Sequence, residues 1–208
     1  SSGNSADVRP VLWESLMRET DSESIAAAIE ARLLDRPHDD ESLAFGDIGI
    51  RVKPLGQGTF GSASIIWRSR EKDLVVAKES KIPMGGDAQI LQRFNREREL
   101  FDVLTGKFVT PDLRAHGVLE DEAGARYPYF LLEYLQGQSL DHLYNAGDKL
   151  SSRFIGNSLV TWLLMLKEFE RLGIAHRDLK PGNMLVAEIE ARYRFLDLGL
   201  AFGEPVED

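Results

Sequence analysis

The sequence predicts an α+β fold with two unequal parts, a sheet-rich part followed by a helical part. Three observations lead to this prediction. Apolar residues alternate along short runs between residues 47 and 133, which is the period of β-strands. One helical pattern, residues 88–104, interrupts these runs. A long amphipathic pattern then occupies residues 152–172. The 208 residues, 43% of them hydrophobic and 28% charged, fit a globular protein of ordinary size.

Composition excludes several classes of protein. The chain has no cysteine, which removes disulfides, thiolate nucleophiles and cysteine-based metal sites. Its net charge of -9 repels phosphate backbones, so nucleic acid is not an expected partner. No apolar run approaches the roughly 20 residues that span a bilayer, and the first residues lack the charged and apolar regions of a secretory signal, so none is expected. We therefore expect a cytoplasmic protein without a membrane span.

Residues 1–46 are expected to contain a flexible lead-in and a helical extension. Val8, Leu12 and Leu16 recur at helical spacing, and a second apolar stripe follows the capping-box pattern at residues 20–23. Two interpretations remain for this extension. It packs on the main domain, or it is a regulatory or docking segment.

A glycine-rich turn joins the first two strands expected after residue 47. Its sequence, Gly56-Gln57-Gly58-Thr59-Phe60-Gly61, reads G-x-G-x-x-G. A dinucleotide-binding fingerprint of this form opens a helix, whereas here strand-like runs lie on both sides. Glycines lack a Cβ and so allow backbone N–H groups to approach phosphates. The alternative is a plain hairpin in which the glycines serve only the turn.

The next strand ends on Lys78, after four apolar residues. A lysine in this position needs an anionic partner if it is buried, or it extends to solvent at the strand end. In the helix at residues 88–104, Glu97 shares a face with Phe94 and Phe101, whereas Glu99 lies about 160° further round. Glu97 is therefore the predicted partner of Lys78.

The helical part, residues 134–208, leads into a polar loop. The residues expected to be buried along its long helix are Ile155, Leu159, Leu163, Leu166 and Phe169. The loop that follows is His176-Arg177-Asp178-Leu179-Lys180-Pro181-Gly182-Asn183. Two short strands come next, and the second ends at Asp197-Leu198-Gly199.

These segments together resemble the eukaryotic-type Ser/Thr protein kinase family over about residues 46–203. The order is glycine hairpin, strand lysine, helix glutamate, long helix, H-R-D-L-x-x-x-N loop and acidic turn. The resemblance implies a kinase-like two-lobed fold. The expected N-lobe, residues 47–133, has five antiparallel strands and an αC helix. The expected C-lobe, residues 134–208, is reduced and helical, and residues 1–46 form the N-terminal helical extension.

The resemblance also implies transfer of a phosphoryl group from ATP to Ser or Thr hydroxyls of a protein substrate. Asp178 is then the catalytic carboxylate that orients the acceptor hydroxyl. Lys180 contacts the γ-phosphate. Lys78, fixed by Glu97, holds the α- and β-phosphates.

The cofactors that the resemblance implies are ATP and Mg²⁺. Asn183 and Asp197 are the expected Mg²⁺ ligands, because a hard cation takes oxygen ligands. The other expected nucleotide-binding residues cover the triphosphate, line the adenine slot or present hinge backbone groups: Leu55, Gly56, Gly58, Gly61, Ala63, Ala77, Leu132, Glu133, Leu135 and Leu185.

The sequence departs from the family pattern in two places. The acidic turn has leucine where phenylalanine is common, and leucine fills a similar space. Only residues 200–208 follow Gly199, without the full activation segment and later helices of the family. Three explanations are a naturally minimal kinase, a fragment of a longer kinase, and a nucleotide-binding interaction module. We favour the first, which is similar to compact bacterial effector kinases that act in the host cytosol.

Partners and regulation follow from the same departure. A regulatory partner is expected at the open C-lobe or at the N-terminal helices, which themselves could cover apolar surface. Arg177 meets an activation-loop phosphate in the family, yet residues 200–208 contain no Ser, Thr or Tyr. We therefore expect activity without loop phosphorylation, with Glu204, Glu207 or Asp208 as a substitute anion. Small-molecule phosphotransferases, which commonly have glycine at the position of Arg177, are the remaining alternative.

Overall fold

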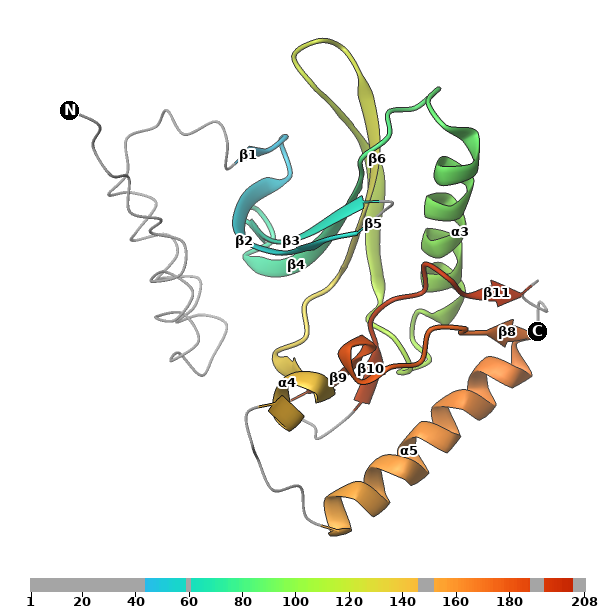
Figure 1. The fold of residues 1–208 in the computed structure, drawn as a ribbon. Coiled ribbons are helices and arrows are strands. Elements are labelled where there is room, and N and C mark those ends of the chain that lie inside the picture. Colours follow the sequence, from blue (N-terminus) through green and yellow to red (C-terminus); the bar gives the residue numbers. More distant parts are fainter. Residues whose placement is uncertain (1–43, 59–60, 146–151, 188–192, 204–208) are drawn as a thin grey trace.

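The first half of the structure, a computed structural model, is an antiparallel sheet (Figure 1). The structure describes residues 44–58, 61–145, 152–187 and 193–203, so the helices expected before residue 44 lie outside the described residues. The strand order in the sheet is β1-β2-β3-β4-β6-β5. The five expected strands are β2 to β6, and β1 adds a short edge strand. The bounds are β1 (Ala44–Phe45), β2 (Gly49–Gln57), β3 (Gly61–Arg68), β4 (Asp73–Ser80), β5 (Leu113–Glu120) and β6 (Arg126–Glu133).

One helix, α3 (Ala88–Leu104), packs beside this sheet and has the predicted bounds. It begins at Asp87, whose carboxylate accepts hydrogen bonds from two backbone N–H groups of the first turn. Phe130 of β6 contacts Phe94 and Phe101 of the helix, with ring centroids 5.1 and 5.9 Å apart. These aromatic contacts fix the rotation of α3 and turn Glu97 toward the sheet.

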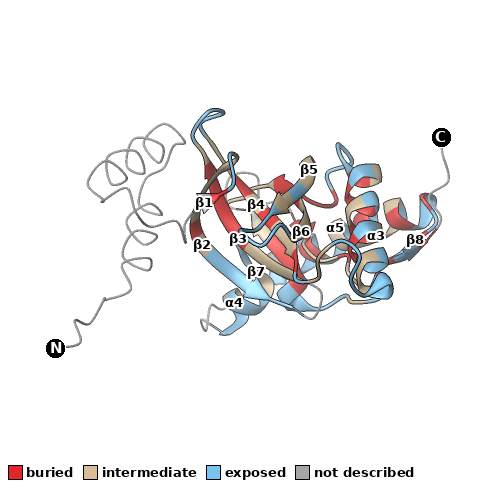
Figure 2. Cartoon of the chain, turned by 90° about the horizontal axis from the view of Figure 1, so that it is seen from above, coloured by how far each residue is buried: buried red, intermediate tan, exposed pale blue. Residues whose placement is uncertain are grey.

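The second half of the described chain combines two helices with two small sheets. One sheet has the order β10-β9-β7, and the other pairs β11 with β8. β8 lies directly before the polar loop and β9 directly after it, so both sheets anchor this loop. Buried residues of one core run from α3 and β6 to α5 and β8 (Figure 2). The bounds are β7 (Gly137–Ser139), α4 (Leu140–Asn145), α5 (Ser152–Arg171), β8 (Ile174–Ala175), β9 (Met184–Ala187), β10 (Tyr193–Phe195) and β11 (Phe202–Gly203).

Helix α5 buries a different face from the predicted one. Leu166 and Phe169 contact the core as expected. Ile155, Leu159 and Leu163, however, are 47%, 51% and 66% exposed, so this part of the prediction is wrong.

The packing of α5 explains this difference. Trp162 on the buried face meets Tyr193 of β10 edge to face, with ring centroids 5.9 Å apart. Met165 and Leu172 join the same core. Because α5 is apolar on two faces, its sequence period does not distinguish them, and the position of β10 decides which one is covered.

The strand β6 ends at Glu133, two residues before its predicted end at Leu135. Tyr134 and Leu135 instead belong to the connection that leads into β7. The lobe boundary at residue 133 stays a prediction. Among the described residues, no helix has the length and apolar character needed to cross a membrane.

Candidate active site

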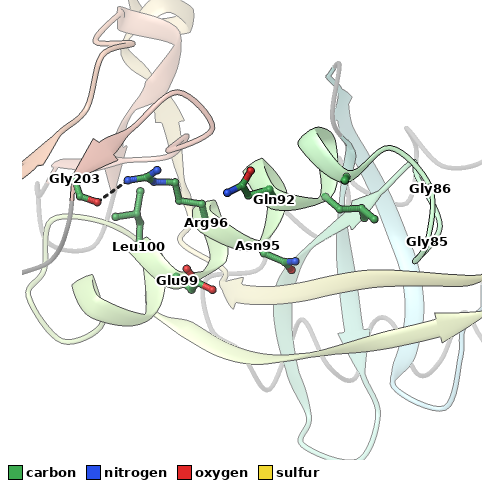
Figure 3. Close-up of a pocket in the computed structure, with 10 residues that line it drawn as sticks. Gly85, Gly86, Gln92, Asn95, Arg96, Glu99, Leu100 and Gly203 are labelled. Atoms are coloured by element: carbon green, nitrogen blue, oxygen red, sulfur yellow. Dashed lines mark hydrogen bonds between the residues drawn. The ribbon is translucent and has the colours of Figure 1, made fainter.

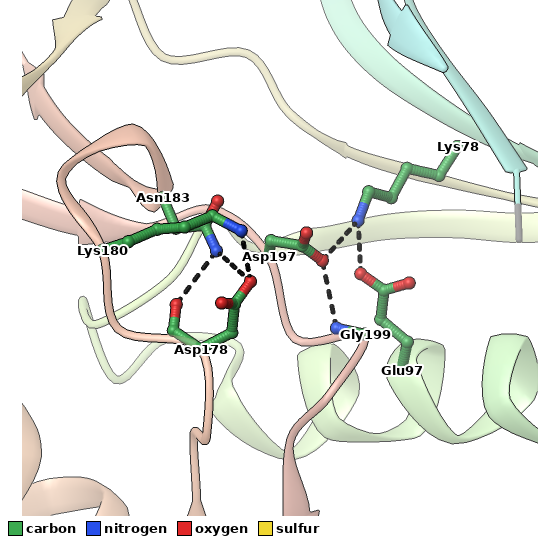
Figure 4. Close-up of polar contacts among 7 residues, drawn as sticks. All are labelled: Lys78, Glu97, Asp178, Lys180, Asn183, Asp197 and Gly199. Atoms are coloured by element: carbon green, nitrogen blue, oxygen red, sulfur yellow. Dashed lines mark hydrogen bonds and ion pairs between the residues drawn. The ribbon is translucent and has the colours of Figure 1, made fainter. Parts of the chain in front are cut away.

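Three charged side chains meet between the sheet, α3 and the turn after β10 (Figure 4). The Lys78 ammonium of β4 forms an ion pair with Glu97 of α3 and lies 3.4 Å from Asp197 Oδ1. Glu97 is buried, whereas Asp197 is partly exposed. The structure therefore contains the Lys78–Glu97 pair that the helix-face argument predicts.

The electrostatics of this cluster follow from one ammonium shared by two carboxylates. Burial lowers the pKa of Lys78, but the charges of Glu97 and Asp197 outweigh burial and raise it. Burial raises the pKa of the deeply placed Glu97 despite the nearby ammonium. Burial also raises the pKa of Asp197. The Lys78 charge and the hydrogen bond from the Gly199 N–H outweigh burial, so the pKa of Asp197 is lowered. Asp197 is therefore ionised at neutral pH, the form in which an aspartate binds a cation.

Gly199 supports the position of Asp197, a role that the sequence did not reveal. Its backbone N–H donates to Asp197 Oδ1 at 3.0 Å. A Cβ at this position would lie 3.2 Å from the same oxygen and 3.9 Å from Glu97 Oε2. The absence of a side chain thus allows the turn to close around the carboxylate.

The polar loop forms a second cluster around Asp178 (Figure 4). Asp178 Oδ2 accepts hydrogen bonds from Lys180 Nζ at 2.6 Å and from Asn183 Nδ2 at 2.8 Å. Asn183 Nδ2 also donates to the Asp178 backbone carbonyl at 3.0 Å. The amide nitrogen of Asn183 is thereby committed, and its carbonyl oxygen is the atom that can bind a cation. The hydrogen bond from Lys180 lowers the pKa of Asp178, so this group is ionised at neutral pH.

The loop itself is held by a buried histidine. His176 contacts the rings of Phe169 and Phe195, at centroid distances of 5.7 and 5.0 Å. Its Nδ1 accepts the Asp178 N–H at 3.3 Å. Arg177 between them has a φ of 64°, a left-handed conformation that costs energy in a residue with a side chain. The buried histidine and the strands on both sides hold the loop in this conformation.

The environment of His176 predicts an acid-sensitive fold. Burial lowers its pKa below the ordinary 6.5, against a smaller opposite effect of the Asp197 and Asp178 charges. As the pH falls below about 6.5, the unfolded chain binds a proton on this histidine and the folded chain resists it. The free energy of unfolding should then decrease toward pH 5. His176→Phe should flatten this slope by up to about 1.4 kcal/mol per pH unit.

Urea unfolding at pH 7.5 and at pH 5.5 measures this difference. Phenylalanine keeps the ring contacts and removes the titrating group. The exposed His142 of α4, replaced in the same way, is the matched control for the loss of a histidine. An equal pH slope in wild type and His176→Phe would contradict the assignment.

The glycines of the glycine-rich turn differ in the space around them. A Cβ at Gly56 would meet nothing within 4 Å, and one at Gly58 would meet only the Gly61 carbonyl at 3.8 Å. A Cβ at Gly61, in contrast, would lie 2.4 Å from the Glu79 carbonyl of β4. Gly56 and Gly58 therefore leave open space for a ligand, and Gly61 permits β3 to pack on β4. Residues 59 and 60 lie outside the described residues.

Two alanine substitutions separate these functions. Gly61→Ala should reduce the free energy of unfolding by about 1 to 3 kcal/mol, because the methyl group overlaps a backbone oxygen. Gly56→Ala should change stability by less than about 0.5 kcal/mol. It should nevertheless weaken nucleotide binding about tenfold, since the methyl group enters the space left for phosphates. Chemical unfolding and calorimetric titration with ATP measure the two effects. Equal loss of stability in both variants would refute the division.

One predicted adenine-slot residue lies on the wrong face of the sheet. Ala77 is fully buried in a core with Phe45 and Leu131, opposite to the Lys78 side. Alternate residues of a strand share a face, so Val76 is the residue on the Lys78 side. Val76 packs against the main core, as Leu132 does, and pairs with it across the strands. The alternation in the sequence already contained this signal.

Three other predicted slot residues, Leu55, Ala63 and Leu185, lie on three different strands. Ala63 of β3 pairs with Lys78, and paired residues share a face. Leu55 of β2 is half exposed. Leu185 lies between Met184 and Val186, which face the core, and so points to the other side of β9.

The contact of the hinge residues Glu133 and Leu135 with adenine stays a prediction. The Glu133 carboxylate pairs with Arg114 at 3.1 Å, and its N–H donates to the Asp112 carbonyl at 2.8 Å. These contacts fix the end of β6. The Glu133 carboxylate is engaged by Arg114. We therefore expect any contact of Glu133 with adenine to come from its backbone.

Few side chains in the described part of this site could hold a metal ion. Within the described residues, no group of three or more His, Cys, Asp or Glu side chains is placed to hold a metal. Asn183 and Asp197 offer two oxygen donors, which suits Mg²⁺, since this ion binds one or two protein groups together with phosphates and water.

Comparison with known proteins identifies the class. The family model for the protein kinase domain matches residues 50–203, about three quarters of the chain. This chain belongs to the protein kinase family, as the sequence predicted, and the fold prediction is confirmed with it.

Individual relatives give the same result. PknB of Bifidobacterium longum is 27% identical over 150 residues, which is 71% of this chain and 22% of the relative. The serine/threonine-protein kinase greatwall of Xenopus tropicalis is 29% identical over 154 residues, or 72% of this chain and 16% of the relative. The serine/threonine-protein kinase AfsK of Streptomyces coelicolor is 27% identical over 154 residues, with 72% and 18% covered. The chain thus spans about a fifth of the length of these relatives.

Proposed function

We propose that this chain transfers the γ-phosphoryl group of Mg²⁺-ATP to Ser or Thr hydroxyls of a protein substrate. The observation that carries the proposal is the pair of clusters in Figure 4, one around Lys78 and one around Asp178. Phosphoryl transfer depends on positioning and on charge stabilisation. A fixed ammonium for the phosphates and a carboxylate for the acceptor provide both. The serine/threonine-protein kinases among the relatives support the same reaction.

The residues present fit Mg²⁺-ATP. Gly56 and Gly58 leave the turn open on the side where a triphosphate would lie. The Asn183 carbonyl and the ionised Asp197 are hard oxygen donors. When bound, Mg²⁺ neutralises charge on the phosphate oxygens.

The proposed proton transfer takes place at Asp178. Both side-chain hydrogen bonds described for Asp178 end on Oδ2, which leaves Oδ1 to accept the hydroxyl of the substrate. The acceptor oxygen forms a bond to the γ-phosphorus as the bond from phosphorus to the bridging oxygen of ADP breaks. Since its pKa is lowered, Asp178 is a weak base and receives the hydroxyl proton late. Lys180, exposed beside it, stabilises the charge on the transferring group.

The proposal gives the substrate only as a class of molecule. A protein kinase domain implies a protein acceptor. We place the reaction in the cytoplasm, where ATP is abundant, and we propose that other proteins regulate it.

Transfer of labelled γ-phosphate to extract proteins tests the proposal, followed by mass spectrometry of the acceptor residues. We expect label on Ser and Thr, complete loss on removal of Mg²⁺ with EDTA, and a higher Mg²⁺ requirement in Asp197→Asn. Asp102→Asn, an exposed change on α3, should behave as wild type. Label on a small metabolite instead of protein would favour a small-molecule phosphotransferase. Stabilisation by ATP without transfer would favour a binding module.

A further inference from the structure

Phe202 of β11 contacts two arginines from different parts of the molecule. The Arg96 guanidinium carbon of α3 lies 4.3 Å from the centroid of the ring. The Arg177 guanidinium carbon of the polar loop lies 4.5 Å from it. Both distances are within the range of cation–π interactions. The ring thus brings two like charges to one place without an intervening anion in the described contacts.

The backbone of β11 adds a second connection to the helix. Arg96 donates a hydrogen bond to the Gly203 carbonyl at 2.7 Å (Figure 3). Gly203 pairs with Ile174 of β8, and Phe202 pairs with Ala175. A Cβ at Gly203 would lie 2.3 Å from the Gly173 carbonyl, so glycine permits this close pairing. Helix α3, β11 and β8 are therefore joined at one point.

The two arginines are the sequence neighbours of the two reactive clusters. Arg96 precedes Glu97, which holds Lys78, and Arg177 precedes Asp178. Adjacent helix residues are about 100° apart, so Arg96 faces β11 while Glu97 faces the sheet. A shift of the Phe202 ring would act on both neighbours through short backbone paths.

Simple packing is a weak explanation for the ring. Phe202 is 48% exposed, and Arg96 lines an open groove of about 890 Å³ beside the start of α3. A half-exposed ring keeps about half of its apolar area in water, so burial alone does not specify its position. The specific contacts of the Phe202 ring are those with the guanidinium groups of Arg96 and Arg177.

We propose that Phe202 is a positioning residue, which sets α3 against the polar loop by holding Arg96 and Arg177 on one aromatic ring. This inference rests on the proposed phosphoryl transfer for its effect on rate, but not for its effect on structure. It gives the chain a way to align Glu97 and Asp178 through an aromatic side chain.

The test compares Phe202→Leu, which keeps apolar volume, with Phe202→Tyr, which keeps the aromatic ring. Loss of two exposed cation–π contacts should lower kcat about 5- to 20-fold in Phe202→Leu. KM for ATP should change less than about twofold, because the nucleotide contacts remain. Phe202→Tyr should keep kcat within about twofold of wild type, as its ring also binds cations. Phe108→Leu is the matched control, since Phe108 is an exposed ring near Arg194, outside both clusters.

Amide hydrogen exchange provides a readout that does not depend on activity. Exchange in residues 94–104 and 174–178 should accelerate in Phe202→Leu and stay at the wild-type rate in Phe202→Tyr and Phe108→Leu. Equal kcat and equal exchange in all variants would overturn the inference, and so would equal loss in the leucine and tyrosine variants. If the wild type transfers no phosphate, the proposed function fails, and hydrogen exchange alone still decides the positioning role.

Discussion

Asp178→Asn should lower kcat for phosphoryl transfer by about 100- to 10,000-fold, the range of general acid–base contributions. Asparagine keeps the shape of the side chain and an oxygen that accepts the Lys180 hydrogen bond. It cannot take up the hydroxyl proton. Because the nucleotide contacts belong to other residues, the dissociation constant for ATP should change less than about threefold.

Single-turnover assays and calorimetric titration with Mg²⁺-ATP separate these two effects. Asp102→Asn, the exposed change on α3, should leave both values unchanged. A variant at Asp178 that keeps more than half of the wild-type rate would remove this carboxylate from the reaction. Loss of nucleotide binding together with rate would instead assign it a structural role.

Glu97→Gln should lower kcat/KM about 10- to 100-fold, since a hydrogen bond between charged groups is worth about 1.5 to 3 kcal/mol. Lys78 would keep Asp197 as its anion but lose the partner that fixes it from α3. The effect on stability should be small, within about 1 kcal/mol, because the neutral amide avoids the burial cost that raises the pKa of Glu97.

Glu99→Gln provides the control on the same helix. Glu99 is exposed and pairs only with its neighbour Arg98 among the described ion pairs. This variant should keep both the rate and the free energy of unfolding. Similar losses at the two positions would show that the glutamate charge acts through the helix as a whole rather than through Lys78.

The positions of the reactive groups could be predicted because they depend on local patterns. The bounds of α3 follow from its cap and its apolar period, and the same period places Glu97 inward. The polar loop and the acidic turn are each a continuous stretch of sequence. The residues within each stretch are therefore close to one another in any fold. The pairing of Lys78 with Glu97 needed one further step, since a buried ammonium requires an anion.

Ala77 is a residue whose strand face was predicted wrongly from the sequence. The sequence places both Ala77 and Lys78 at the end of one apolar run, but neighbouring strand residues face opposite sides. Ala77 faces the core with Phe45, and Val76 faces the Lys78 side. The alternation was available in the sequence, and the resemblance to a family pattern obscured it.

The sequence by itself determined the five main strands of the large sheet, the bounds of α3, the Lys78–Glu97 pair and the residues of the polar loop, but not the short strands β1, β7, β8 and β11. Only the tertiary structure decided which face of α5 is buried, why Gly61 must lack a side chain, and where Phe202 meets Arg96 and Arg177. The reason is physical. Periodicity and local hydrogen bonding act over a few residues and are written in the sequence. Close approach between distant segments depends on where the whole chain places them, and no local pattern contains that information.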